Sequence, residues 1–218
     1  FTIYSLISNA DWLPFTNGSK KDEVALSKDI HTIEIEGSSA SLQVVVEKRD
    51  NVHAVLEGKG DVSVEKNGKT IAVEYTPPTF NTFSFFNRNK VTIYIPESFD
   101  QNLEFDIGSG NLNFSNSANQ PLNLKELIVD ISSGNVKIEH VHAEVLESDV
   151  SSGNVSLRNV TAEKGKISVR SGNTTVKQFV GSFDATVSSG NLEVEMNEVT
   201  GDIKMQVNSG REIGRAHV

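Results

Sequence analysis

Apolar and polar residues alternate through the second half of the chain, and the alternation is organised around a recurring Ser-Gly-Asn triplet. The triplet occurs at 109–111, 133–135, 152–154, 171–173 and 189–191. A sixth copy begins at Ser209-Gly210 and continues with Arg211. Successive glycines stand 24, 19, 19, 18 and 20 residues apart, which predicts a structural repeat.

Residues at fixed distances from each glycine form apolar columns. The position three before is always Ile or Val, and the positions two and four after are apolar in the first five copies except at Thr174. Alternate side chains of a strand share one face, so each copy predicts two short strands joined at a corner. Lys137, Glu139 and Arg158 fall at the intervening positions and are expected to point outward.

One such strand pair cannot bury its apolar face alone, whereas stacked copies can. A period near 19 residues is too short for a propeller blade and lacks a helical pattern. We therefore predict an all-β fold, a parallel β-solenoid or β-helix-like stack of short strands. The inner column seven residues before each glycine has one gap, at Gly165.

The triplet has a local role in this fold. Gly adopts positive φ without a Cβ penalty, Asn tolerates it and can bond the Asn of the next rung, and the Ser hydroxyl can satisfy a corner backbone group. Corner formation accounts for the pattern, and a Ser/Asn row that binds a glycan or an ice-like lattice is the functional alternative. The predicted structural corners are Gly110, Asn111, Gly134, Asn135, Gly153, Asn154, Gly172, Asn173, Gly190 and Asn191.

The first half predicts less regular β rungs. Residues 31–47 repeat the strand–corner–strand plan with Gly37 at the bend, and Asn67-Gly68 is a strong hairpin signal. A weak helical pattern covers Asp22–Lys28. Further strands are predicted at 52–56, 62–65, 71–75 and 91–96.

A Pro- and Asn-rich segment between two of these strands contains Phe80, Phe83, Phe85 and Phe86. It shows no strand pattern. We expect the Phe80–Phe86 loop to fold over the solenoid as a lid, and the alternative is an exposed aromatic loop that contacts a partner or a membrane surface.

The expected organisation is a single β-solenoid domain over 24–212. Residues 1–23 form an N-terminal segment whose first residues are too short to span a bilayer, and they are expected to follow a removed membrane anchor or to be an ordinary first strand. Residues 213–218 resemble a translated sequencing adapter and are expected to lie outside the fold.

Composition narrows the function. The chain has no Cys, which excludes disulfides, thiolate metal sites and a Cys nucleophile. Its 29 acidic and 20 basic residues give a formal charge of −9, shared by both halves. Without a basic arm or patch, nucleic acid is not expected as a partner.

Candidate chemistry is sparse. Asp106, Asp130 and Asp149 each stand four residues before a corner glycine, so they predict an outward acidic ladder and a weak Ca²⁺ or Mg²⁺ candidate. His140 and His142 supply at best half of a metal site, and a surface bend is the favoured interpretation. No catalytic residue and no cofactor is predicted.

The Ser-Gly-Asn-[Val/Leu]-x-[Ile/Leu/Val] rungs, preceded by Val91-Thr-Ile-Tyr-Ile-Pro96, resemble the bacterial "toast-rack" family of adhesin-like domains of unknown function, and within it LiaG-like proteins of envelope-stress operons. The resemblance spans about residues 24–211 and implies a membrane-anchored protein whose β domain lies outside the cytoplasm. Arg211 departs from the Asn that the motif places there.

The expected function is therefore a non-catalytic module for interaction or stress response at the cell envelope. Its expected partner is an envelope protein or a cell-wall polymer. The alternative is a carbohydrate-active enzyme, a polysaccharide lyase or hydrolase on a β-helix, whose site would require carboxylates that converge on one outer face.

Overall fold

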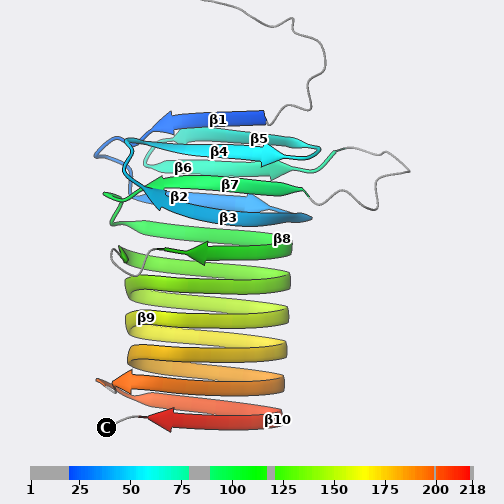
Figure 1. The fold of residues 1–218 in the computed structure, drawn as a ribbon, viewed down its shortest axis with the longest axis vertical. Helices are drawn as coiled ribbons and strands as arrows, with labels where there is room; N and C mark the ends of the chain where they lie inside the picture. The colour runs from blue at the N-terminus through cyan, green and yellow to red at the C-terminus, as the bar shows by residue number, and fades with distance from the viewer. Residues whose placement is uncertain (1–19, 79–88, 117–120, 199, 217–218) are drawn as a thin grey trace, which may run out of the picture.

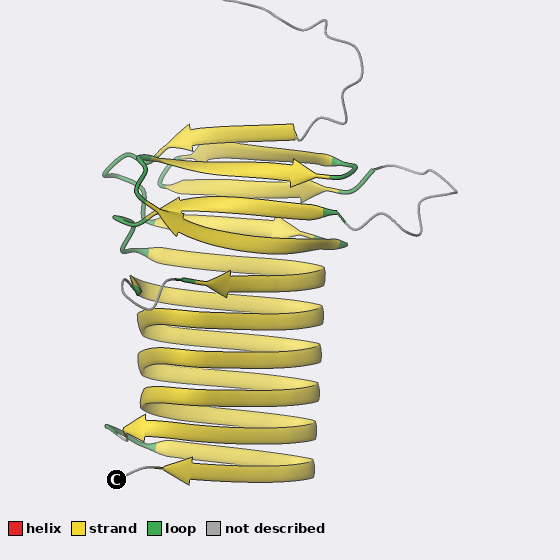
Figure 2. Cartoon of the chain, viewed as in Figure 1, coloured by secondary structure: helices red, strands yellow, loops and turns green. Residues whose placement is uncertain are grey.

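The computed structural model describes residues 20–78, 89–116, 121–198 and 200–216 of the 218-residue chain. All regular structure in these segments is β-strand (Figure 2). The strands are β1 (Lys20–Ala25), β2 (Thr32–Gly37), β3 (Ala40–Glu47), β4 (Asn51–Glu57), β5 (Asp61–Asn67), β6 (Thr70–Thr76), β7 (Lys90–Pro96), β8 (Asn102–Ser115), β9 (Leu122–Glu198) and β10 (Ile203–Ala216).

The second half winds as a stack of rungs along the long axis of the molecule (Figure 1). β9 is continuous through 77 residues, and it pairs in parallel with β8 before it and with β10 after it. The corner glycines align, because Gly110 is opposite Gly134 and Gly190 is opposite Gly210. The prediction of an all-β, parallel β-solenoid fold is confirmed.

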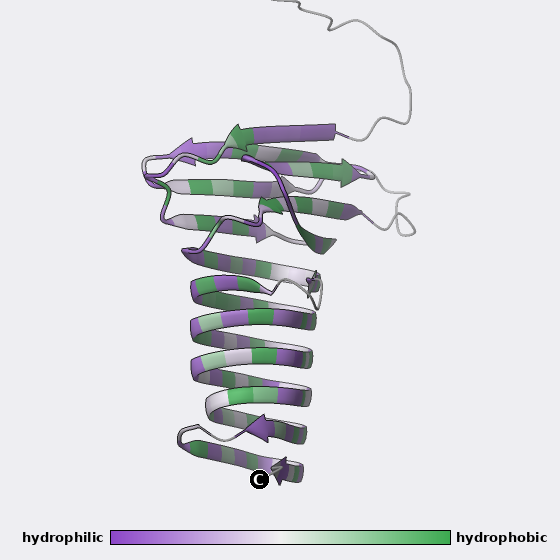
Figure 3. Ribbon diagram, turned by 60° about the vertical axis from the view of Figure 1, so that its left-hand side comes forward, coloured by the Kyte–Doolittle hydropathy of each residue, from purple (hydrophilic) through white to green (hydrophobic). Residues whose placement is uncertain are grey.

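The predicted apolar columns form the core of this stack. In β8 and β9 the residues three before and two or four after each corner glycine are buried, from Ile107 to Val194. Apolar and polar residues alternate along every rung in Figure 3, as expected of strands with one buried face. Phe179 occupies the space beside Gly165, where a Cβ would lie 2.8 Å from the ring atom Cζ.

The first half continues the stack upward from β8. β2 and β3 together form one rung, with Ile33 opposite Leu103 and Leu42 opposite Leu112. β6 and β7 add in parallel to β2 and β3, whereas β5, β4 and β1 add in antiparallel fashion. The strand order is therefore β1-β4-β7-β3-β8-β2-β6-β5, and the hairpin at Asn67-Gly68 is confirmed.

Two local expectations are wrong. Asp22–Lys28 is not helical, because residues 20–25 form β1 and Val24 pairs with Val52 at the rim of the core. The bend expected at Gly37 falls later, since Gly37 aligns with the strand residue Ile107 and the positive φ of 62° is at Ser39.

The strands also extend past the expected domain limits. β1 includes residues 20–23, and β10 pairs residues 213–216 with β9. The Phe80–Phe86 loop and residues 1–19 lie outside the described residues. No helix long and apolar enough to cross a membrane is found in the part of the chain that the structure describes.

Candidate functional site

The corner glycines are required by both conformation and space. Gly110, Gly134, Gly153, Gly172 and Gly190 have φ between 138° and 150°, a region that side chains strain to adopt. A Cβ at any of the last four would also overlap the carbonyl oxygen of the glycine one rung before. The rungs therefore approach more closely at this corner than any residue other than Gly allows.

An amide ladder runs beside these glycines, and all five of its asparagines are exposed. The Nδ2 atom of each Asn donates to Oδ1 of the Asn before it. The distances are 2.8 Å from Asn135 to Asn111, 2.8 Å from Asn154 to Asn135, 3.0 Å from Asn173 to Asn154 and 2.7 Å from Asn191 to Asn173. The ladder fixes the register of successive rungs.

The corner serines form fewer hydrogen bonds to the backbone than the sequence predicts. Only Ser109 meets the expectation, because its Oγ accepts a hydrogen bond from the backbone N–H of Ser39 at 3.2 Å. Within the described segments, the hydroxyls of Ser133, Ser152, Ser171 and Ser189 have no hydrogen-bond partner. Satisfaction of a corner backbone group therefore explains one serine of the five.

A second corner lies six residues after Gly134, Gly153 and Gly172, and it was not predicted as a repeat from the sequence. His140, Asn159 and Gln178 have φ of 58°, 52° and 56°. The Nδ1 atom of His140 lies 3.0 Å from the backbone oxygen of Asn116, and Asn159 Nδ2 lies 3.1 Å from His140 Nε2. Their spacing of 19 residues was the available signal.

The three candidate aspartates lie in register on one outer face. Asp106 is opposite Asp130, and Asp149 is the next residue of the row. The structure extends the row upward, because Asp106 is also opposite Glu36 and Glu36 is opposite Glu74. This carboxylate ladder crosses five successive strand segments, and no ion pair with a basic side chain is formed by its members within the described residues.

Ionisation is disfavoured at two members of the ladder, Asp130 and Glu36. Desolvation, followed by the charges of Asp149 and Asp106, raises the pKa of Asp130 above its ordinary value. Desolvation and the neighbouring Glu34, Asp106 and Glu74 raise the pKa of Glu36. The repulsion is therefore distributed along the ladder.

Metal-ligand geometry is not found among these groups. Across residues 20–78, 89–116, 121–198 and 200–216, no three His, Asp or Glu side chains converge to hold a metal ion. His140 belongs to the second corner, whereas His142 is exposed two residues later. His140 therefore lies at a bend, and His142 on the outer face of β9.

Two adjoining hollows lie on the same outer face as the carboxylate ladder. The upper hollow has a volume of about 240 Å³ and is lined by Ile128, Asp130, Glu147, Asp149, Lys166 and Ser168. The lower hollow, of about 270 Å³, is rimmed by Glu147, Lys164, Lys166, Asp184, Asp202 and Lys204. Because they share Glu147 and Lys166, we treat both as one depression, named here the axial groove.

The axial groove runs along the axis of the stack. Ile128, Glu147, Lys166, Asp184 and Lys204 each stand six residues before a corner glycine, on successive rungs. Lys166 Nζ lies 3.9 Å from Glu147 Oε2, and Lys204 is opposite Asp184. The groove therefore offers alternating charges at the spacing of the rungs.

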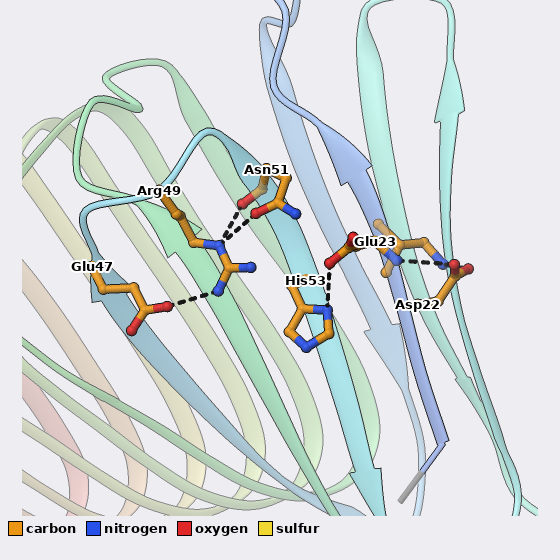
Figure 4. A network of polar contacts seen from close by, with 7 residues as sticks. Asp22, Glu23, Glu47, Arg49, Asn51 and His53 are labelled. Atoms are coloured by element: carbon orange, nitrogen blue, oxygen red, sulfur yellow. Dashed lines mark hydrogen bonds and ion pairs between the residues drawn. The ribbon is translucent and has the colours of Figure 1, made fainter.

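A separate polar cluster lies on the N-terminal sheet (Figure 4). Arg49 Nε donates to the backbone oxygen and Oδ1 of Asn51, both at 2.8 Å, and its Nη1 lies 2.8 Å from Glu47 Oε1. His53 Nδ1 lies 3.3 Å from Glu23 Oε2, without hydrogen-bond geometry. The guanidinium also lies 5.2 Å from the centre of the Tyr94 ring. These contacts tie β1, β4 and β7 together and have a structural role.

The fold and its faces define a class of protein: a β-solenoid scaffold whose outer faces carry polar side chains in register. The model of the Toastrack DUF4097 family matches residues 30–211, so the chain belongs to this family. No curated protein matches the chain.

Solved structures of similar fold include proteins from Bacteroides, Clostridium and Parabacteroides. A candidate adhesin from Bacteroides fragilis is 15% identical, with 92% of this chain and 98% of that chain covered and a TM-score of 0.52. A candidate cell adhesion protein from Clostridium sporogenes is 14% identical, with coverage of 91% and 98% and a TM-score of 0.45. A candidate lipid binding protein from Parabacteroides distasonis is 14% identical, with coverage of 91% and 95% and a TM-score of 0.47. These likenesses show the fold alone.

Proposed function

We propose that this domain is a non-catalytic binding module of the bacterial cell envelope. In this proposal it stands outside the cytoplasm on a membrane anchor, as LiaG-like proteins of envelope-stress operons are expected to do, and its partner is an envelope protein or a cell-wall polymer. Support comes from membership of the Toastrack DUF4097 family and from the name of a similar structure, the candidate adhesin of Bacteroides fragilis.

The observation that carries the proposal is the contrast between the inward and the outward side chains of each rung. The inward columns and the corners account for the stability of the stack. Among the described residues, the Glu147–Lys166 ion pair is the one formed by the outward carboxylates and lysines of the axial groove. Charged groups held in register on a rigid scaffold are suited to contact with a partner.

The test is co-sedimentation of the purified domain with isolated bacterial envelopes. Retention of the domain above that of an unrelated β protein of equal net charge supports the proposal, as does recovery of the full gene product in the membrane fraction. A domain that stays in the supernatant, from a protein found free in the cytoplasm, contradicts it.

The alternative function, cleavage of a polysaccharide, is tested with the same purified domain. Incubation with cell-wall and plant polysaccharides, with and without Ca²⁺, would release reducing or unsaturated ends. If Asp130→Asn abolished that release, the result would support catalysis and contradict the proposed binding role, because an amide cannot transfer a proton as a carboxyl group does.

A further inference from the structure

The axial groove contains charged groups that the fold does not use. Asp130 and Asp149 at its upper end, and Lys164 and Lys204 at its lower end, form no ion pair and no side-chain hydrogen bond within the described part of the chain. All four are exposed. The stack therefore leaves these groups available for a ligand.

The direction of the groove selects an extended ligand. Its lining residues lie on successive rungs, and parallel rungs repeat at about 4.8 Å. A linear polymer laid along the axis would meet a new polar group at each rung. A compact small molecule would contact only one of the two hollows.

The mixed charge of the groove selects among linear polymers. An anionic chain would be repelled by Asp130, Glu147 and Asp149 at the upper end. At the lower end, three lysines stand among three carboxylates, so this hollow has no net charge to attract either a cationic or an anionic chain. Hydroxyl groups both donate and accept, so a polyhydroxyl chain can pair with carboxylates at one end and with ammonium groups at the other.

Apolar surface beside the charges suits a sugar ring. Ile128 lines the upper hollow and Val145 the lower one, and both are half-buried. The methylene stems of Lys164, Lys166 and Lys204 add apolar surface beneath their charged ends. Sugar rings present C–H groups on their faces and hydroxyls at their edges, which matches a floor of this kind.

We propose that the axial groove binds a linear, neutral, hydroxyl-rich glycan that lies parallel to the solenoid axis. This inference rests on the proposed function and names the class of cell-wall polymer. The carboxylates at the upper end accept hydrogen bonds from hydroxyls, and the lysines at the lower end donate hydrogen bonds to hydroxyl oxygens.

The experiment compares three double variants with the unsubstituted domain in pull-downs with insoluble chitin and purified peptidoglycan. Asp130→Asn with Asp149→Asn neutralises the upper end, and Lys164→Gln with Lys204→Gln neutralises the lower end. The control pair is Lys48→Gln with Glu65→Gln, which changes two exposed groups outside the groove that form no side-chain hydrogen bond or ion pair within the described chain. A thermal midpoint for each variant shows that the fold is retained.

We expect each groove variant to weaken retention at least about tenfold, since each removes two charge-assisted hydrogen bonds. The control variant should bind as the unsubstituted domain does. Stronger binding by the upper-end variant would overturn the inference, because a polyanion gains when carboxylates are neutralised. Unchanged binding in both groove variants would overturn it as well.

The two proposals can fail separately. A domain that sediments with envelopes but binds neither chitin nor peptidoglycan overturns the glycan groove and leaves the envelope role in place. A domain that sediments with none of the three materials overturns both.

Discussion

At the scale of single residues, Thr174 is a polar exception in an apolar column. It is 1% exposed, and its Oγ1 has no hydrogen-bond partner. The equivalent positions of the other rungs are Leu112, Val136, Val155 and Leu192. A buried hydroxyl without a partner loses its hydrogen bonds to water and gains none in the protein. Thr174→Val should therefore stabilise the fold by about 1 kcal/mol. The midpoint of urea unfolding measures it, and the half-buried outward neighbour Thr175→Val should change stability by less than about 0.5 kcal/mol.

A glycine at a corner can be compared with a glycine in a hairpin. Gly153 has φ of 149°, and a Cβ there would overlap the carbonyl oxygen of Gly134. Gly68 has φ of 64° in a hairpin, with nothing within 4 Å of an added Cβ. Gly153→Ala should therefore cost about 2–4 kcal/mol from overlap and strain together. Gly68→Ala should cost about 1 kcal/mol. Equal shifts of the unfolding midpoint would contradict the close approach of rungs at the corner.

At the scale of elements, alternation was sufficient to predict the rungs because inward and outward positions are set by period two. The positions of the corners were harder to predict from the sequence. Gly marks the first corner in the rungs of β8, β9 and β10, whereas the second corner of three rungs is formed by His140, Asn159 and Gln178, which share no residue type. The bend predicted at Gly37 from its residue type was wrong, because the register with β8 decides where the bend falls and places it at Ser39.

The groove and the full carboxylate ladder were beyond prediction from the sequence. Three of the ladder's carboxylates share one offset from the glycines, but Glu36 and Glu74 join through pairing of β2 with β8 and β6. Parallel pairing between strands far apart in the chain depends on tertiary packing. The alternating charges of the groove share one offset, six residues before each corner glycine, but the hollow between them depends on how the side chains pack.

The carboxylate ladder also predicts how stability depends on pH. The pKa values of the ladder residues Glu36 and Asp130, and of Glu104 outside the ladder, are raised in the folded protein, by desolvation first and by neighbouring carboxylates second. Folding then binds protons, so stability should rise as pH falls from neutral through these raised pKa values. The rise should end near the ordinary carboxyl values. Unfolding midpoints between pH 7 and pH 4 measure it, and Asp130→Asn should reduce the slope.

Other carboxyl groups have the opposite effect at lower pH. Hydrogen bonds from Ser27 and Lys66 lower the pKa of Asp29 from 3.8 to about 2. Desolvation acts against ionisation of Glu139, but hydrogen bonds from Lys137 and Ser115 outweigh it and lower the pKa. The stability that these two groups contribute is present above their ordinary values and is lost as pH falls through the lowered ones. A stability profile that falls steadily from pH 7 would contradict the role of the ladder.

At the scale of the whole molecule, the stack ends at its upper side in two strand edges that protect each other. β1 and β5 are the terminal strands of the sheet order, and they lie close together at that end (Figure 1). Asp22 Oδ2 accepts the backbone N–H of Val64 at 2.7 Å, and Lys20 Nζ lies 3.2 Å from Asp61 Oδ1. An unprotected edge is a template for pairing with another chain.

Loss of these side-chain contacts should therefore change the assembly state. In Lys20→Ala with Asp22→Ala, the N–H of Val64 loses its acceptor and the edge of β5 becomes free to pair. We expect self-association that increases with concentration, measured by light scattering during size-exclusion chromatography. Lys21→Ala is the matched control, because the side chain of this exposed residue of β1 forms no hydrogen bond or ion pair among the described residues. A double variant that remains in the same assembly state as the control at every concentration would show that strand pairing, not side-chain capping, protects this end.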